Sequence, residues 1–130
     1  MLFRSYGTIF VSIADEDKEL ALPLIRRFYN LGFNIEATKG TAQFLKQNGI
    51  RTRIKKKISE GSEEILDSMR KGYVSYVIST RDLESINQES DGAKIRGCAV
   101  ENNIPMFTAL DTVNVLLDVL EEKTLGISTI

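Results

Sequence analysis

Two kinds of segment alternate along this chain, one with short apolar runs and one with apolar residues three or four positions apart. The short runs are rich in β-branched and aromatic residues and predict buried strands, whereas the longer spacing predicts helices with one apolar face. The predicted strands cover residues 8–13, 33–37, 51–58, 73–79 and 104–108. The predicted helices cover residues 20–31, 41–47, 62–71, 91–102 and 111–121, followed by a frayed tail over residues 123–130.

Five strand–helix pairs in strict alternation predict an α/β fold. We expect an open, mostly parallel five-stranded sheet of the Rossmann-like or flavodoxin-like kind, with right-handed crossovers and helices on both faces. A length of 130 residues fits one domain, here residues 1–130 with a core from about 7 to 122. The sequence shows no repeat, linker or low-complexity tract that would divide it.

The periodicity also predicts which side chains face inward. The first helix should bury Leu20, Ala21, Leu24, Ile25, Phe28 and Leu31. Pro23 lacks the N–H that a helix interior needs, so this helix should begin late or bend. The fourth helix should bury Ile95, Cys98, Ala99 and Val100.

The third predicted strand, residues 51–58, has an unusual composition. Its apolar anchors are Ile54 and Ile58, and alternation places Arg51, Arg53 and Lys55 on one side. Such a row of cations is typical of an outward strand face or of an edge strand, which charge keeps soluble.

Chemistry in such a sheet is expected at the carboxyl ends of the strands, beside the point where the strand order reverses. In this chain those ends carry several hydroxyls and two or three cations. The strand ends comprise residues 15–18, 38–41, 57, 79–81 and 108–112. Hydroxyl donors, cations and free backbone N–H groups together suit a phosphate.

The turn from Thr38 to Thr41 is the most informative of these ends. A helix start offers free N–H groups and the positive end of the helix dipole, and Gly40 would let an oxygen approach the backbone. Both threonine hydroxyls could add donors to an anion site. The alternative is that Thr38 or Thr41 simply caps the helix.

Two lysines and one loop complete the candidate set. Lys18 could reach an anion over the strand ends, or it could be an ordinary solvated lysine. Lys57 differs from its basic neighbours because it lies where the predicted strand ends. Residues 80–90 form a polar connection that is long for a compact domain, which suggests function or mobility. The acids at 15–17 are best explained as helix-capping and dipole-favoured residues.

Composition removes several classes of function. The chain has no histidine, so it has no imidazole base and no histidine-liganded zinc, and we expect no metal or cofactor. A net charge of −1 argues against non-specific nucleic-acid binding. Cys98 is the single cysteine, which fits a reducing cytoplasm and, on a helix's inner face, an inert thiol. No apolar run approaches the roughly 20 residues of a membrane helix.

Several segments together carry a family resemblance that runs in register over about residues 7–122. They are Phe10-Val11-Ser12-Ile13 leading to Asp17-Lys18, Gly32-Phe33, Ala37-Thr38-x-Gly40-Thr41-Ala42, Asn48-Gly49-Ile50, Lys57-Ile58-x-Glu60-Gly61, Ile95-Arg96 and Ile104-Pro105-x-Phe107-Thr108. These segments resemble the methylglyoxal-synthase-like (MGS-like) domain, in the version at the carboxyl end of the carbamoyl-phosphate synthase large subunit.

That resemblance implies a regulatory domain without catalysis of its own, as a fragment of a longer ATP-dependent ligase that supplies pyrimidine and arginine biosynthesis. It would bind a phosphorylated nucleotide such as UMP or IMP. The implied effector and phosphate site comprises Lys18, Thr38, Gly40, Thr41, Lys57, Ser79 and Thr80. The implied partners are the other domains of the large subunit and the small glutaminase subunit, and a homo-oligomer is compatible with the resemblance.

Two positions depart from that family. Ser79-Thr80-Arg81 stands where the family commonly has an Asn-Thr pair and another small polar residue, and Arg96-Gly97 stands where two arginines are frequent. Both lie where a base, a ribose or a neighbouring domain would be contacted. The identity of the effector is therefore left open.

Three alternatives can be compared by motif. Methylglyoxal synthase, a lyase acting on dihydroxyacetone phosphate, has a Gly-Gly-Asp segment where this chain has residues 58–62, and it uses histidines. The inosinate cyclohydrolase domain has a His-Pro-Lys-Val-His type of segment that this chain lacks. A phosphoacceptor receiver domain needs an aspartate after the third strand and a lysine after the fifth. This chain has Lys57 and Phe107-Thr108 there.

Overall fold

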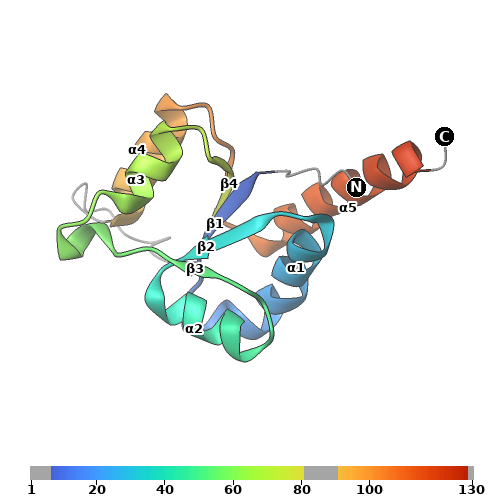
Figure 1. The fold of residues 1–130 in the computed structure, drawn as a ribbon, viewed down its shortest axis with the longest axis horizontal. Coiled ribbons are helices and arrows are strands. Elements are labelled where there is room, and N and C mark those ends of the chain that lie inside the picture. The colour runs from blue at the N-terminus through green and yellow to red at the C-terminus, as the bar shows by residue number, and fades with distance from the viewer. Residues whose placement is uncertain (1–6, 81–90, 129–130) are drawn as a thin grey trace.

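A five-stranded sheet with helices on both of its faces forms the centre of the protein (Figure 1). The computed structural model describes residues 7–80 and 91–128. The strands are β1 (Thr8–Ser12), β2 (Asn34–Ala37), β3 (Arg53–Ile54), β4 (Val74–Ser79) and β5 (Met106–Phe107). The helices are α1 (Lys18–Leu31), α2 (Lys39–Gln47), α3 (Glu64–Arg70), α4 (Asp91–Glu101) and α5 (Leu110–Ser128), with short 3-10 turns at Asp15–Asp17 and Ile58–Glu60.

The strand order is β3-β2-β1-β4-β5, and all four neighbouring pairs are parallel. The α/β class and the parallel five-stranded sheet predicted from the sequence are therefore confirmed. The order reverses between β1 and β4, so the crevice that binds ligands in such sheets lies outside the carboxyl ends of these two strands. Arg81 and the rest of the predicted functional loop, residues 81–90, lie outside the described residues.

Two apolar clusters hold the layers together. Alternate residues of each strand point to opposite faces, so Ile9 and Val11 face one cluster while Phe10 faces the other. The first cluster includes side chains of α1, α2 and α5, and the second includes side chains of α3 and α4. Figure 1 shows the same division, with α3 and α4 on one side of the sheet and α1 and α5 on the other.

Two side chains predicted to face inward do not. Leu20 is 70% exposed, and Val100 is also exposed, although Ala21, Ile25, Phe28, Ile95, Cys98 and Ala99 are buried as predicted. Leu20 lies in the first turn of α1, and Val100 lies near the end of α4. The expectation was wrong at both positions because successive helix residues are turned by about 100°. Leu20 is therefore turned away from the face that buries Ala21, and Val100 from the face that buries Ala99.

The third strand is much shorter than the predicted residues 51–58. It contains only Arg53 and Ile54, and Ile54 is exposed rather than an apolar anchor. Most of the segment consists of cations, which do not pack against a sheet face and leave little reason for a longer ladder. Of the two predicted positions, an outward face or an edge, the edge is confirmed, because β3 is the outermost strand next to β2.

Two helix boundaries also differ from the prediction. Helix α1 starts at Lys18, directly after the 3-10 turn at Asp15–Asp17, so Pro23 lies inside the helix and the helix does not begin late. Helix α5 continues to Ser128, through most of the segment that we expected to be a frayed tail. No proline stops it, and Glu121 is paired with Arg27 of α1, which ties this part of the helix to the domain.

Candidate functional site

The ends of β1 and β4 meet where the strand order reverses, and a threonine joins them. Thr80, the residue after β4, accepts a hydrogen bond at its Oγ1 from the backbone N–H of Ala14 at 2.9 Å. Its own backbone N–H donates to the carbonyl oxygen of Ser12 at 3.0 Å. Ser79 is buried beside them, in register with Ser12. The turn after β1 is therefore held against the end of β4.

Thr41 joins the same turn to α2. Its Oγ1 accepts a hydrogen bond from the backbone N–H of Ile13 at 3.1 Å, and its side chain is fully buried. This hydroxyl therefore does not cap α2, and that alternative explanation is wrong for Thr41. Because Oγ1 acts as the acceptor in this bond, its hydrogen can still be donated to a further group.

Thr38 is the N-cap residue of α2, but its side chain makes no capping hydrogen bond. The residue is only 5% exposed, and its Oγ1 has no hydrogen-bond partner among the described residues. The simple capping interpretation is therefore wrong here too. A buried hydroxyl without a partner costs free energy, and it is unusual enough to need an explanation.

The first turn of α2 presents backbone donors next to these hydroxyls. The first bond inside the helix runs from the N–H of Ala42 to the carbonyl of Thr38, at 2.8 Å. The N–H groups of residues 39–41 precede it, as at every helix start. Together with the positive end of the helix dipole, they favour an anion at this place.

Lys18 reaches over this helix start from the beginning of α1. A Cβ atom placed on Gly40 would lie 3.8 Å from Lys18 Nζ, and the lysine side chain is only 15% exposed. The ammonium pairs with the carboxylate of Asp15, whose side chain is mostly exposed. The lysine is therefore held close to the backbone of α2, and it is not an ordinary solvated residue.

Lys57 lies at the same edge of the sheet but is separate from this group. It follows β3 by three residues, is half-buried, and precedes the 3-10 turn at Ile58–Glu60. Its backbone N–H donates to Glu60 Oε1 at 3.2 Å. Across the described residues, no hydrogen bond or ion pair connects the Lys57 side chain to Lys18, Thr38 or Thr41.

The structure thus gathers most of the sequence-predicted set on the turn after β1. Thr41 and Thr80 bond to successive N–H groups there, and Lys18 lies against Gly40. Sequence reasoning missed the roles of Ile13 and Ala14, because backbone N–H groups leave no signal in the residue type. It also missed Asp15 as the partner of Lys18.

Other features bear on the chemistry that is available. No group of three His, Cys, Asp or Glu side chains that could hold a metal ion occurs within residues 7–80 and 91–128. None of the helices described combines the length and apolar character needed to cross a bilayer. The donors at the strand ends are therefore hydroxyls, backbone N–H groups and an ammonium, a set that matches the oxygens of a phosphate.

Comparison with known proteins agrees with this architecture. Two solved structures share the fold. Methylglyoxal synthase from Elizabethkingia anophelis NUHP1 has a TM-score of 0.68 and 19% identity, covering 85% of this chain and 76% of that chain. ForH has a TM-score of 0.60 and 16% identity, covering 90% of this chain and 81% of that chain. Residues 20–108, more than half of the chain, match the family model of the MGS-like domain. The chain belongs to the MGS-like domain family.

Proposed function

We propose that this chain is the effector-binding domain of a carbamoyl-phosphate synthase large subunit, and that it binds a phosphorylated nucleotide such as UMP or IMP. The observation that carries the proposal is the unpartnered, buried hydroxyl of Thr38 at the start of α2. A phosphate oxygen is an acceptor for that hydroxyl. The subfamily and the nucleotide are supported by the motifs quoted from the sequence.

The phosphate would be held by groups from three segments. Thr38 and Thr41 would donate hydroxyl hydrogens, the N–H groups of residues 39–41 would bond its oxygens, and Lys18 would supply the positive charge. Lys18 is already near this place, 3.8 Å from a Cβ position on Gly40. The phosphate would compete with the exposed carboxylate of Asp15 for this ammonium. Lys57 would approach from the end of β3.

Binding at this site would regulate a longer enzyme rather than perform chemistry. An effector can shift distant catalysis only if it binds one global state more tightly than another. A typical coupling of about 1–3 kcal/mol would change an apparent affinity by roughly 5- to 150-fold. The other domains of the large subunit and the glutaminase subunit are the proposed partners, acting in the cytoplasm.

A second candidate function is a lyase acting on dihydroxyacetone phosphate. It is favoured by the structural similarity to a methylglyoxal synthase at a TM-score of 0.68. Glu60 is the carboxylate nearest in sequence to the place of that family's catalytic aspartate. Here Glu60 Oε1 accepts the N–H of Lys57 at 3.2 Å, so this oxygen is engaged in the turn. Both candidates use the same phosphate-binding strand ends.

Calorimetric titration tests the first candidate. The chain is titrated with UMP, IMP, inorganic phosphate and the nucleoside uridine, which lacks a phosphate. We expect at least one nucleotide to bind and uridine not to bind. The Thr38→Val variant keeps the side-chain shape and should weaken nucleotide binding by about ten-fold, the effect of one charge-assisted hydrogen bond. Thr124→Val on α5 is the matched control and should bind as the parent does.

Incubation with dihydroxyacetone phosphate, followed by a colour test for methylglyoxal, separates the two candidates. Turnover above that of a heat-killed sample, abolished in Glu60→Gln, would establish the lyase. Binding of a nucleotide without turnover supports the regulatory domain. If no phosphorylated compound binds and Thr38→Val behaves as the parent chain, the phosphate site itself is wrong.

A further inference from the structure

Glu36 is a buried acid on β2, next to the edge strand β3 and two residues before Thr38. It lies on β2 between Ile35 and Ala37 and is only 2% exposed. Its neighbours Ile35 and Ala37 belong to the apolar cluster on the α1 side, so alternation directs Glu36 to the opposite face, the face covered by α3. A lone carboxylate in such an apolar strand needs compensating groups.

Only one of the two carboxylate oxygens of Glu36 has compensating groups nearby. Oε2 lies 3.6 Å from Arg53 Nη1 and 3.8 Å from Lys55 Nζ, the two cations that follow on β3 and directly after it. Oε1 is buried and has no hydrogen-bond partner in the part of the chain that the structure describes. An acceptor oxygen with both lone pairs unused is unfavourable in a protein interior, and a bound donor would correct this.

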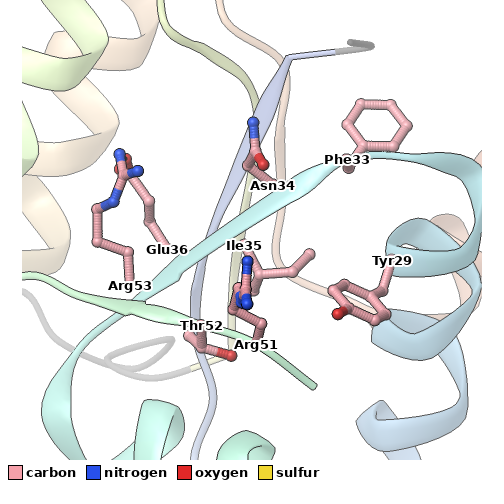
Figure 2. A pocket seen from close by; sticks show the side chains of 8 residues that line it. All are labelled: Tyr29, Phe33, Asn34, Ile35, Glu36, Arg51, Thr52 and Arg53. Carbon is pink, nitrogen blue, oxygen red and sulfur yellow. The ribbon is translucent and has the colours of Figure 1, made fainter. Parts of the chain in front are cut away.

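Three hollows meet at Glu36 and Arg53. One, of about 280 Å³, opens toward Tyr29 on α1. A second, of about 230 Å³, lies between the sheet edge and α3, and a third, of about 400 Å³, extends past Tyr73 to Gly7. Figure 2 shows the side chains of Glu36 and Arg53 together on one side of β2, with Tyr29 on the other. Glu36 is therefore a lining residue of all three hollows, although its Oε1 is itself buried.

The charges around the second hollow are balanced. Its lining has three acids, Glu36, Glu64 and Asp67, and three bases, Arg53, Lys55 and Lys71. A simple anion would be repelled by Glu36, and a simple cation by Arg53 and Lys55. A molecule with one charge of each sign meets neither obstacle. The guanidinium of Arg53 is already 3.6 Å from Glu36 Oε2 through Nη1, but it has further N–H donors and its side chain is 71% exposed.

We propose that the second hollow, a groove between the sheet edge and α3, binds a small zwitterion of the amino-acid class. Its ammonium group pairs with the carboxylate of Glu36, and its carboxylate pairs with the guanidinium of Arg53, which recognises carboxylates in a planar, two-point manner. The site is separate from the phosphate-binding strand ends and does not depend on the proposed function. It would give the domain a second class of ligand.

Amide shifts in the ¹H–¹⁵N spectrum of the labelled chain test this site. The common L-amino acids are added one at a time at constant ionic strength. We expect at least one of them to shift amides of β2, β3 and α3 in a saturable way. For that amino acid, the amide that lacks the carboxylate and the acid that lacks the amine should each bind at least about ten-fold more weakly.

Two variants test whether the ligand contacts Glu36 and Arg53. Glu36→Gln keeps the shape but removes the charge, and Arg53→Gln changes an exposed side chain, so both should fold. Each should weaken binding by about ten-fold, the effect of one charge-assisted contact. Glu63→Gln, on an exposed acid outside the lining of the groove, is the control and should bind as the parent chain does.

Three results would overturn the proposal. The first is that no amino acid shifts the groove amides, which would mean that Arg53 and Lys55 alone compensate the charge of Glu36. The second is unchanged affinity in Glu36→Gln. The third is equal affinity for the amide without a carboxylate, which would show a site for simple cations.

Discussion

Thr41 Oγ1 accepts the backbone N–H of Ile13 at 3.1 Å, across 28 residues of sequence. This bond fixes the start of α2 against the turn that follows β1. Thr80 Oγ1 binds the next N–H of that turn, from Ala14. Two threonines from different elements thus hold two successive backbone donors, and the phosphate-binding geometry that we propose depends on this arrangement.

Replacing Thr41 with valine should destabilise the chain. Valine has nearly the same shape but no acceptor, so the buried N–H of Ile13 loses its partner. We expect a loss of about 1–3 kcal/mol in the free energy of unfolding, measured by urea denaturation. Thr41→Ser keeps the hydroxyl and should recover most of that loss. Equal stability of the valine variant and the parent would show that water replaces the bond without penalty.

Replacing Gly40 with alanine should weaken nucleotide binding while the chain still folds. The new methyl group would meet Lys18 Nζ at 3.8 Å, an ordinary contact, so the chain should fold. The methyl occupies the approach between Lys18 and the helix start, and titration should show weaker nucleotide binding. Gly97→Ala, in α4 with open space around it, is the control for helix propensity. It should stabilise the chain by roughly 0.5–1 kcal/mol. Undiminished binding in Gly40→Ala would contradict the proposed approach path.

Lys57 and its neighbour Lys56 form a matched pair for testing the third strand end. Lys57 is half-buried whereas Lys56 is exposed. If Lys57 supplies one charge-assisted contact to the phosphate, Lys57→Ala should weaken nucleotide binding by about ten-fold. Lys56→Ala should leave the affinity nearly unchanged, apart from a small salt-dependent effect. A similar loss in both variants would indicate only a diffuse positive field.

Arg27 and Glu121 should make stability depend on pH. Arg27 of α1 bonds both carboxylate oxygens of Glu121 of α5, at 2.6 and 3.1 Å, and this hydrogen bonding lowers the pKa of Glu121 below its usual value of 4.5. A lowered folded-state pKa gives stability that is complete above the unfolded pKa and is lost as the pH falls through the folded pKa. Arg27→Gln should therefore cost about 1 kcal/mol near neutral pH, since partly exposed charges are screened, and less in acid.

Urea denaturation at neutral and acidic pH measures this difference, and Arg26→Gln is the control. Arg26 donates to the carbonyl of Asn48 and has no carboxylate partner among the described residues. Its variant should show the same pH dependence as the parent chain. If the free energies of unfolding of Arg27→Gln and the parent differ by the same amount at neutral and acidic pH, Glu121 is ruled out as the titrating group.

Cys98 should react slowly with thiol reagents. It is buried between α4 and α3, where its Sγ lies 3.9 Å from the carbonyl oxygen of Leu66, and burial raises the pKa of the thiol. A raised pKa leaves less thiolate, the reactive form. Colorimetric labelling of the folded chain should be at least about ten-fold slower than labelling in denaturant. Equal rates would mean that α4 opens readily.

The sequence by itself determined the fold class, because periodicity of burial is a local property. The apolar face of Ala21, Ile25 and Phe28 and the run from Thr8 to Ser12 specify their elements without any knowledge of neighbours. The switch-point rule then named Thr38, Thr41 and Thr80 as a group. Local rules predicted some burial and one strand length wrongly. Leu20 and Val100 are exposed, and residues 51–58 contain only a two-residue strand.

Tertiary structure decided which atoms meet. Whether Thr38 capped its helix or kept a free hydroxyl, and whether Lys18 pointed to solvent or to Gly40, depended on how α1 and α2 approach each other. Glu36 shows the same limit, since its burial and its single paired oxygen follow from the side chains of Arg53 and Lys55 across the sheet edge. Sequence periodicity assigns a residue to a face, but hydrogen bonds form between atoms within about 3 Å, and only the packed chain sets those distances.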